Sequence, residues 1–142
     1  PRILKNRIFL RYIKKKKFLK TIWPTTFPTS SISIKRSFLN AFFEDYTIQK
    51  FDLLEIDFRI TTLAFIVYKN YFITDEVLTT YRIVSDGIMS NLTYLSKKWW
   101  IKRSQAHCFL KEIFENHNIK YTKNYDYYLT KIIVKLLHKF FK

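Results

Sequence analysis

One short stretch, Asp52 to Ile60 with the sequence DLLEIDFRI, carries the residue types best suited to acid–base chemistry. The whole chain has 11 Asp and Glu against 26 Lys and Arg, so a concentration of acidic residues here is unusual. A carboxylate that is held in a partly apolar site can act as a general base. The first question is therefore which of these carboxylates the fold holds in a partly apolar site, and which are exposed to solvent.

The stretch is predicted to open a helix that runs from Asp52 to about Lys69. Asp52 can cap its start, and Glu55 three residues later completes a capping box. Glu55 and Arg59 lie four residues apart, which predicts a surface ion pair. Asp57 falls on the opposite, apolar face, which is formed by Leu53, Leu54, Ile60, Thr61, Ala64 and Tyr68.

A carboxylate on an apolar face has to be hydrogen-bonded, paired or useful, because leaving it buried and alone is costly. Two interpretations of Asp57 are open. It is a general base that faces a cleft, or it is structural and caps a loop or pairs with a buried arginine such as Arg82.

The rest of the chain supplies the elements that would position such a residue. Its 142 residues fit one domain with a real core, and no internal repeat is visible. Apolar and polar residues alternate around Ile32 and Ile34, which predicts a half-buried strand. The other expected elements are a basic helix or arm (1–20), helices at 37–49 and 52–69, extended chain at 71–84, and helices that begin after Ser96 and near Tyr125.

The net charge of +15 attracts phosphate on nucleic acid, on a nucleotide or on an anionic bilayer. The lone Cys108 cannot form an internal disulfide and has no histidine at ligand spacing, which suits a reducing compartment. No apolar run reaches the roughly 18 residues of a spanning helix. Because the chain lacks an initiator Met, we expect it to begin partway through a longer protein.

Three segments, read in order, resemble one family: PTSSISIKRSF (28–38), EIDFRI (55–60) and DEVLTTYRIVSDGIMSNLTYLSKKWWIKRSQAH (75–107). Together they are similar to the C-terminal half of a bacterial family 2 glycosyltransferase with the GT-A fold. The resemblance implies an α+β fold, mostly helical, with a few strands from a GT-A-type α/β domain and an amphipathic C-terminal helix. Residues 1–117 would be the acceptor-side part, and residues 118–142 a linker and the basic helix.

The resemblance also implies an activity. Such enzymes transfer a sugar from a nucleotide-sugar donor to a cell-surface glycan acceptor with inversion, and an acidic residue at a helix start deprotonates the acceptor. Asp57 occupies that position, although Ile56 stands where the family has Glu. The literal Glu-Asp pair at Glu44-Asp45 makes Asp45 the runner-up.

The family's nucleotide-binding half and its Asp-x-Asp pair are missing from these residues. We therefore expect the chain to be inactive alone. A divalent metal, Mg or Mn, is expected in the full-length enzyme, and none is expected on this chain.

Four further residues are candidates for binding donor or acceptor. Arg82 would contact the donor diphosphate, or pair with Asp57 or Asp75 instead. Ser31 and Ser33 would line the acceptor groove, or be plain strand hydroxyls. Trp99 would stack on a sugar, or be part of the core.

The terminal segment 125–142 has apolar residues at helical spacing, with Lys131, Lys135 and Lys139 on the opposite side and no acidic partners for them. This pattern suits a helix on an anionic membrane surface, or a helix docked on the core with solvated lysines. The protein would then be cytoplasmic and peripheral on the inner face of the cell membrane.

Two other functions are kept as alternatives. A small basic nucleic-acid-binding module is disfavoured, because the aromatic residues sit at core-like spacing and no nucleic-acid signature is present. A peripheral membrane protein without catalysis is the other.

Overall fold

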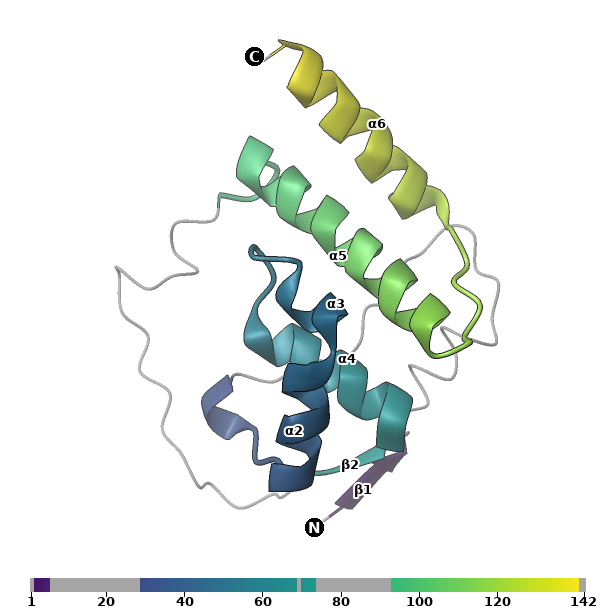
Figure 1. Cartoon of the computed structure of the whole chain (residues 1–142). Coiled ribbons are helices and arrows are strands. Elements are labelled where there is room, and N and C mark those ends of the chain that lie inside the picture. The colour runs from purple at the N-terminus through teal and green to yellow at the C-terminus, as the bar shows by residue number, and fades with distance from the viewer. Residues whose placement is uncertain (1, 6–28, 69, 74–92, 141–142) are drawn as a thin grey trace.

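The computed structural model describes residues 2–5, 29–68, 70–73 and 93–140, and this part of the chain is mostly helical (Figure 1). In chain order the elements are β1 (Arg2–Lys5), the 3-10 helix η1 (Thr29–Ser31), α2 (Arg36–Glu44), α3 (Tyr46–Gln49), α4 (Ile56–Tyr68), β2 (Asn70–Ile73), α5 (Lys97–Asn116) and α6 (Tyr125–Phe140).

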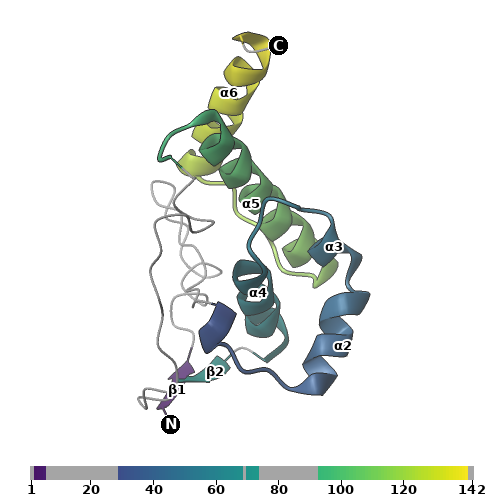
Figure 2. The ribbon, with the colours of Figure 1, turned by 90° about the vertical axis from the view of Figure 1, so that its left-hand side faces the viewer.

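Helix α5 lies between two groups of elements. Helices α3 and α4 pack against one side of it, and α2 packs against α4 and α3. Helix α6 runs along the other side of α5 and extends beyond the remaining helices, as the view in Figure 2 shows. The long helix α5 is therefore the element that connects α6 to the rest of the fold.

The expected α+β fold, a portion of a GT-A-type α/β domain, is wrong. Among the described residues the sheet is a two-stranded antiparallel ribbon, in which Arg2 of β1 is opposite Ile73 of β2 and Lys5 is opposite Asn70. This ribbon also replaces the helix or arm expected at the start of the chain, as far as residues 2–5 are concerned. No α/β layer is formed by the described ranges.

The strand predicted around Ile32 is also wrong. The 3-10 turn at Thr29–Ser31 leads into irregular chain rather than into a strand. The alternation itself is real, because Ile32 and Ile34 pack against the core while Ser31 and Ser33 are exposed. A segment that lays one side on a core shows period-2 alternation whether or not another strand pairs with it. Of the extended chain predicted at 71–84, residues 71–73 lie in strand β2, and the remainder lies outside the described residues.

The two long C-terminal helices are confirmed. Helix α5 begins after Ser96, whose Oγ accepts a hydrogen bond from the backbone N–H of Trp99 at 3.2 Å. It ends where Asn118 takes a left-handed conformation, with φ of 57°, and Ile119 N–H bonds back to the Phe114 carbonyl at 2.7 Å. This is a Schellman ending, in which Asn replaces the commoner Gly.

The predicted helix at 37–49 is divided in two by Asp45. The Asp45 backbone is extended, and its Oδ1 accepts a hydrogen bond from the Thr47 N–H at 2.8 Å, so that it caps α3. Helix α3 is then tied to α5 by Lys50–Glu112 at 2.9 Å and by Asn116 Nδ2 donating to Thr47 Oγ1 at 2.8 Å.

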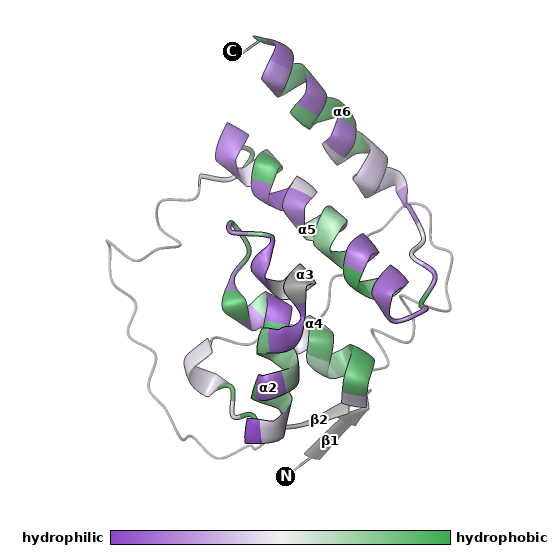
Figure 3. Ribbon diagram, in the orientation of Figure 1, coloured by the Kyte–Doolittle hydropathy of each residue, from purple (hydrophilic) through white to green (hydrophobic). Residues whose placement is uncertain are grey.

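The core is rich in phenylalanine and lies where α2, α4 and α5 meet. Helix α4 is apolar over most of its surface (Figure 3), and it buries residues on more than one side. A Phe109 ring from α5 lies 5.8 Å from the rings of both Phe51 and Phe58, measured between centroids. The buried apolar residues are Phe38, Phe42, Phe51, Leu54, Ile60, Leu63, Phe65, Ile66, Phe109, Leu110, Ile113 and Phe114.

We predict that Phe109→Ala destabilises the protein by about 3–5 kcal/mol, because it removes a fully buried ring and leaves a cavity. The matched control is Phe43→Ala on α2, since the Phe43 side chain is 59% exposed. We expect the control to cost less than about 1 kcal/mol. Urea denaturation followed by circular dichroism measures both, and equal losses would contradict this placement of the core.

Candidate functional site

The segment that opens α4 has a different form from the one predicted. The helix begins at Ile56, and residues 52–54 form a turn that is closed by the Leu54 N–H to the Phe51 carbonyl at 3.1 Å. The predicted capping box at Asp52 is therefore wrong. The first helical bond runs from Arg59 N–H to the carbonyl of Glu55 at 3.3 Å, so Asp57 lies in the first turn.

Two contacts fasten this segment to α5. The backbone N–H of Leu53 donates to Gln105 Oε1 at 3.0 Å, and the carboxylate of Glu55 forms an ion pair with Lys102. The ion pair of Glu55 thus reaches across to another helix, where the sequence had predicted a partner in Arg59. Partial burial lowers the pKa of Lys102, because removal of water disfavours its charged form.

The Asp57 side chain, in the first turn of α4, is half-buried. Its Oδ1 accepts a hydrogen bond from the N–H of Phe58 at 2.7 Å, and its backbone carbonyl accepts one from Thr61 Oγ1 at 2.6 Å. Among the described residues, that hydrogen bond to the carboxylate engages Oδ1. A base at this position would have an oxygen with which to accept a proton.

The first turn of α4 also carries the partly buried charge of Arg59. Burial lowers the pKa of the Arg59 guanidinium, and the nearby Asp52 carboxylate opposes that shift. The start of α4 therefore holds acidic and basic groups at reduced exposure to water, where electrostatic interactions are stronger than in bulk solvent.

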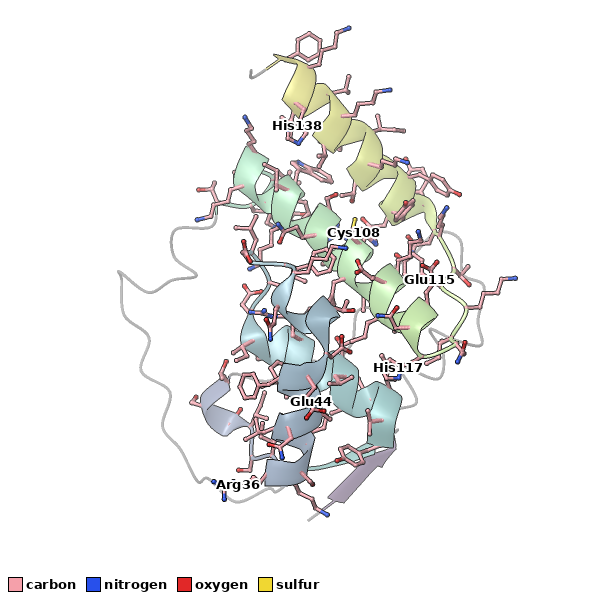
Figure 4. All side chains as sticks on the ribbon, in the orientation of Figure 1. Arg36, Glu44, Cys108, Glu115, His117 and His138 are labelled. Atoms are coloured by element: carbon pink, nitrogen blue, oxygen red, sulfur yellow. The ribbon has the colours of Figure 1, made fainter. Side chains whose placement is uncertain are left out.

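Asp45, the runner-up for the base, has a structural role. One carboxylate oxygen caps α3, and the other lies 3.9 Å from His117 Nε2, beyond the end of α5. Figure 4 labels His117 at this end of the helix. A carboxylate that is already used to hold a helix start is a poorer candidate for accepting a substrate proton.

The other predicted site residues that the structure describes lie outside α4. Ser31 ends η1 and Ser33 follows it, both exposed and beside α2 rather than in a strand. Arg82 lies outside the described residues.

Trp99 lies in the first turn of α5 within a small aromatic cluster. Its ring makes an edge-on contact with Trp100 at 4.7 Å and with Tyr94 at 5.0 Å, and the Arg103 guanidinium lies 5.0 Å from the ring centroid. Trp99 is half-buried, so it is neither a fully exposed sugar platform nor a fully buried core residue.

A polar network between α5 and α6 was missed in the sequence. Asp126 in the first turn of α6 binds Arg103 Nη2 at 2.8 Å through Oδ1 and His107 Nε2 at 3.0 Å through Oδ2. The other ring nitrogen of His107, Nδ1, lies 2.9 Å from the Tyr121 hydroxyl. The spacing of Arg103 and His107, four apart on one face of α5, is the signal that could have indicated a shared partner.

This network holds the two helices together rather than presenting a reactive group. His107 is 1% exposed, and both ring nitrogens are engaged by protein groups, so neither faces a substrate. A buried polar side chain needs such partners to offset the loss of water. Among the described ranges, no three His, Cys, Asp or Glu side chains come together as a metal site. Within the same ranges, no helix has the length and apolar character needed to cross a bilayer.

Comparison of this chain with protein-family models, with curated proteins and with solved structures gives no match. The family resemblance of the three sequence segments therefore stays a prediction.

We predict that Asp126→Ala destabilises the protein by about 2–3 kcal/mol, because it leaves Arg103 and the buried His107 without their carboxylate. Glu115→Ala is the matched control, since Glu115 makes only a 3.8 Å, solvent-exposed pair with Lys111. That change is expected to cost about 0.5 kcal/mol or less. Urea denaturation of both variants measures the difference, and a stable Asp126→Ala protein would contradict the structural role of the network.

We also predict that Cys108 reacts slowly with iodoacetamide at neutral pH. The Cys108 side chain is exposed on α5 (Figure 4), yet the surrounding protein atoms remove part of the water around its thiol and raise the pKa of that thiol, although the nearby ammonium of Lys111 opposes this effect. A raised pKa means less thiolate at any given pH below it, so the folded chain should be alkylated more slowly than the unfolded chain at the same pH. The same reaction in urea gives the reference, and equal rates in the folded and unfolded chain at neutral pH would contradict the prediction.

Proposed function

We propose that this chain is the acceptor-side part of an inverting family 2 glycosyltransferase, with Asp57 as its general base. The proposal rests on the order and spacing of the three family-like segments, and on the place of Asp57 in the first turn of a helix. It does not extend to the GT-A fold, which the helical architecture contradicts.

The observation that carries the proposal is the way the start of α4 is held. Leu53 and Glu55, on the N-terminal side of Asp57, are both bound to α5, and the helix itself begins immediately afterwards. A catalytic base must be kept within a fraction of an ångström of its productive position. The fastening to α5 provides that restraint without using the Asp57 carboxylate itself.

The proposed reaction assigns one step to Asp57. Its carboxylate takes the proton from an acceptor hydroxyl while that oxygen forms a bond to the anomeric carbon of the donor sugar. The bond from that carbon to the nucleoside diphosphate breaks, and the diphosphate leaves with the bonding electrons. Arg82 would bind the donor diphosphate, and Trp99, with Ser31 and Ser33, would contact the acceptor.

The expected divalent metal, Mg or Mn, would belong to the donor side of a full-length enzyme. The described residues provide no set of side chains that would hold it, and we assign no step to a metal on this chain. The donor would be a nucleotide sugar and the acceptor a surface glycan.

The first test is the DNA sequence directly upstream of the Pro1 codon. The proposal requires an in-frame extension that encodes a nucleotide-binding region with an Asp-x-Asp pair. A stop codon directly upstream of Pro1, followed by a translation start, would overturn it.

In the extended protein, we predict that Asp57→Asn lowers kcat by about 10²–10⁴-fold, because Asn keeps the shape of the side chain but cannot accept the proton. Release of nucleoside diphosphate from a panel of nucleotide sugars measures the rate. Asp45→Asn is the matched control and should retain most of kcat. The catalytic role of Asp57 would be refuted by a folded Asp57→Asn enzyme with near-normal kcat.

A further inference from the structure

Helix α6 presents two different sides. The side toward α5 carries the network of Asp126 and the buried Thr130, with half-buried residues between them. The other side is exposed along the whole length of the helix, and Figure 4 shows side chains standing out from it, away from α5.

The exposed side contains an apolar row. Its members follow one another at intervals of three or four residues, so that they form one continuous line along the helix. Their exposed fractions run from 47% to 70%, which is high for large apolar side chains. The apolar row consists of Tyr125, Tyr128, Ile132, Leu136 and Phe140.

A row of lysines lies directly beside the apolar row. Lys131, Lys135 and Lys139 are exposed, four residues apart, and each precedes a member of the apolar row by one position. Hydrophobic and hydrophilic residues therefore alternate along α6, as Figure 3 shows. A lysine can lay its apolar stem along such a row and extend its ammonium outward.

The exposed side of α6 is cationic without a compensating acid. Asp126 is the one carboxylate in residues 118–142 of the sequence, and it is turned toward α5, where it binds Arg103 and His107. The chain as a whole carries a net charge of +15. A surface that matches this one has to be anionic and must also accept apolar side chains.

We propose that the exposed side of α6 docks on an anionic lipid membrane, with the apolar row in the interface and the lysine row on the lipid headgroups. A bilayer with anionic lipids supplies both properties, since its headgroups attract lysine and its acyl boundary accepts Ile, Leu, Phe and Tyr. A second copy of this chain would bring like charge against like charge. Nucleic acid would satisfy the lysines but leave the apolar row unexplained. This proposal does not depend on the proposed transferase activity.

The test is flotation of the full 142-residue chain with vesicles of phosphatidylcholine, with and without phosphatidylglycerol. We expect binding to the anionic vesicles and little binding to the neutral ones. Hydrogen exchange of the bound protein should show added protection at the exposed side of α6. Binding that is equal on both kinds of vesicle, or absent on both, would overturn the proposal.

Two triple variants separate the two rows. Lys131→Gln, Lys135→Gln and Lys139→Gln together should weaken binding about 100-fold, at roughly fivefold for each lysine near the surface. Ile132→Ser, Leu136→Ser and Phe140→Ser together should weaken it by at least about tenfold. Both should remain folded, because the substituted residues face away from α5.

Matched controls make the same chemical changes elsewhere. Lys35→Gln, Lys98→Gln and Lys120→Gln remove equal charge from other exposed positions, and Phe43→Ser, Ile56→Ser and Val67→Ser remove exposed apolar side chains from α2 and α4. If these controls weaken binding as much as the α6 variants do, α6 is not the docking surface. If the serine variant unfolds, the row is covered by another part of the chain and the proposal fails. Binding of an RNA oligonucleotide that survives the serine changes, without vesicle binding, would assign the lysines to nucleic acid instead.

Discussion

His107 is a polar side chain with almost no access to solvent, and the arrangement of the C-terminal half depends on giving its ring partners. It lies on α5 two residues before Phe109, which is also fully buried. Helix α5 therefore needs apolar neighbours on the side of Phe109 and polar partners on the side of His107. Asp126 and Tyr121 supply the polar side. The loop after α5 and the first turn of α6 are therefore fixed by these hydrogen bonds together with the packing of Ile119 and Tyr121 against the core.

Helix α4 is largely apolar, and six of its thirteen residues are buried, two of them threonines. Its two buried threonines, Thr61 and Thr62, remain compatible with these surroundings because their hydroxyls donate to the backbone carbonyls of Asp57 and Phe58, one turn earlier. Both buried hydroxyls are thus hydrogen-bonded within the helix itself. The charged residues of α4 are in its first turn, where the candidate base Asp57 also lies.

The parts that could be predicted from the sequence are those fixed by local signals. The Ser96 cap predicts the start of α5, and the helical spacing of its apolar residues predicts its extent. Helix α6 is predicted by the same kind of spacing. The start of α4 could not be predicted, because Asp52 and Glu55 are used by long-range contacts and a turn rather than by a cap. The alternation at Ile32 indicated burial of one side correctly but not the secondary structure. The spacing of Arg103 and His107 indicates a shared partner, but it does not say which helix supplies that partner.

The absence of α6 from the apolar core has a consequence for the dynamics of the described part of the chain. Its one fully buried residue is Thr130, and the large apolar side chains that build the core come from α2, α4, α5 and the turn before α4. Separation of α6 from α5 would break the Asp126 contacts but would leave that core intact. The helix is therefore placed to open as a cooperative unit of its own, at a lower free energy than global unfolding. The backbone amides of α6 would then exchange faster with solvent than the amides of α2, α4 and α5, which form the core.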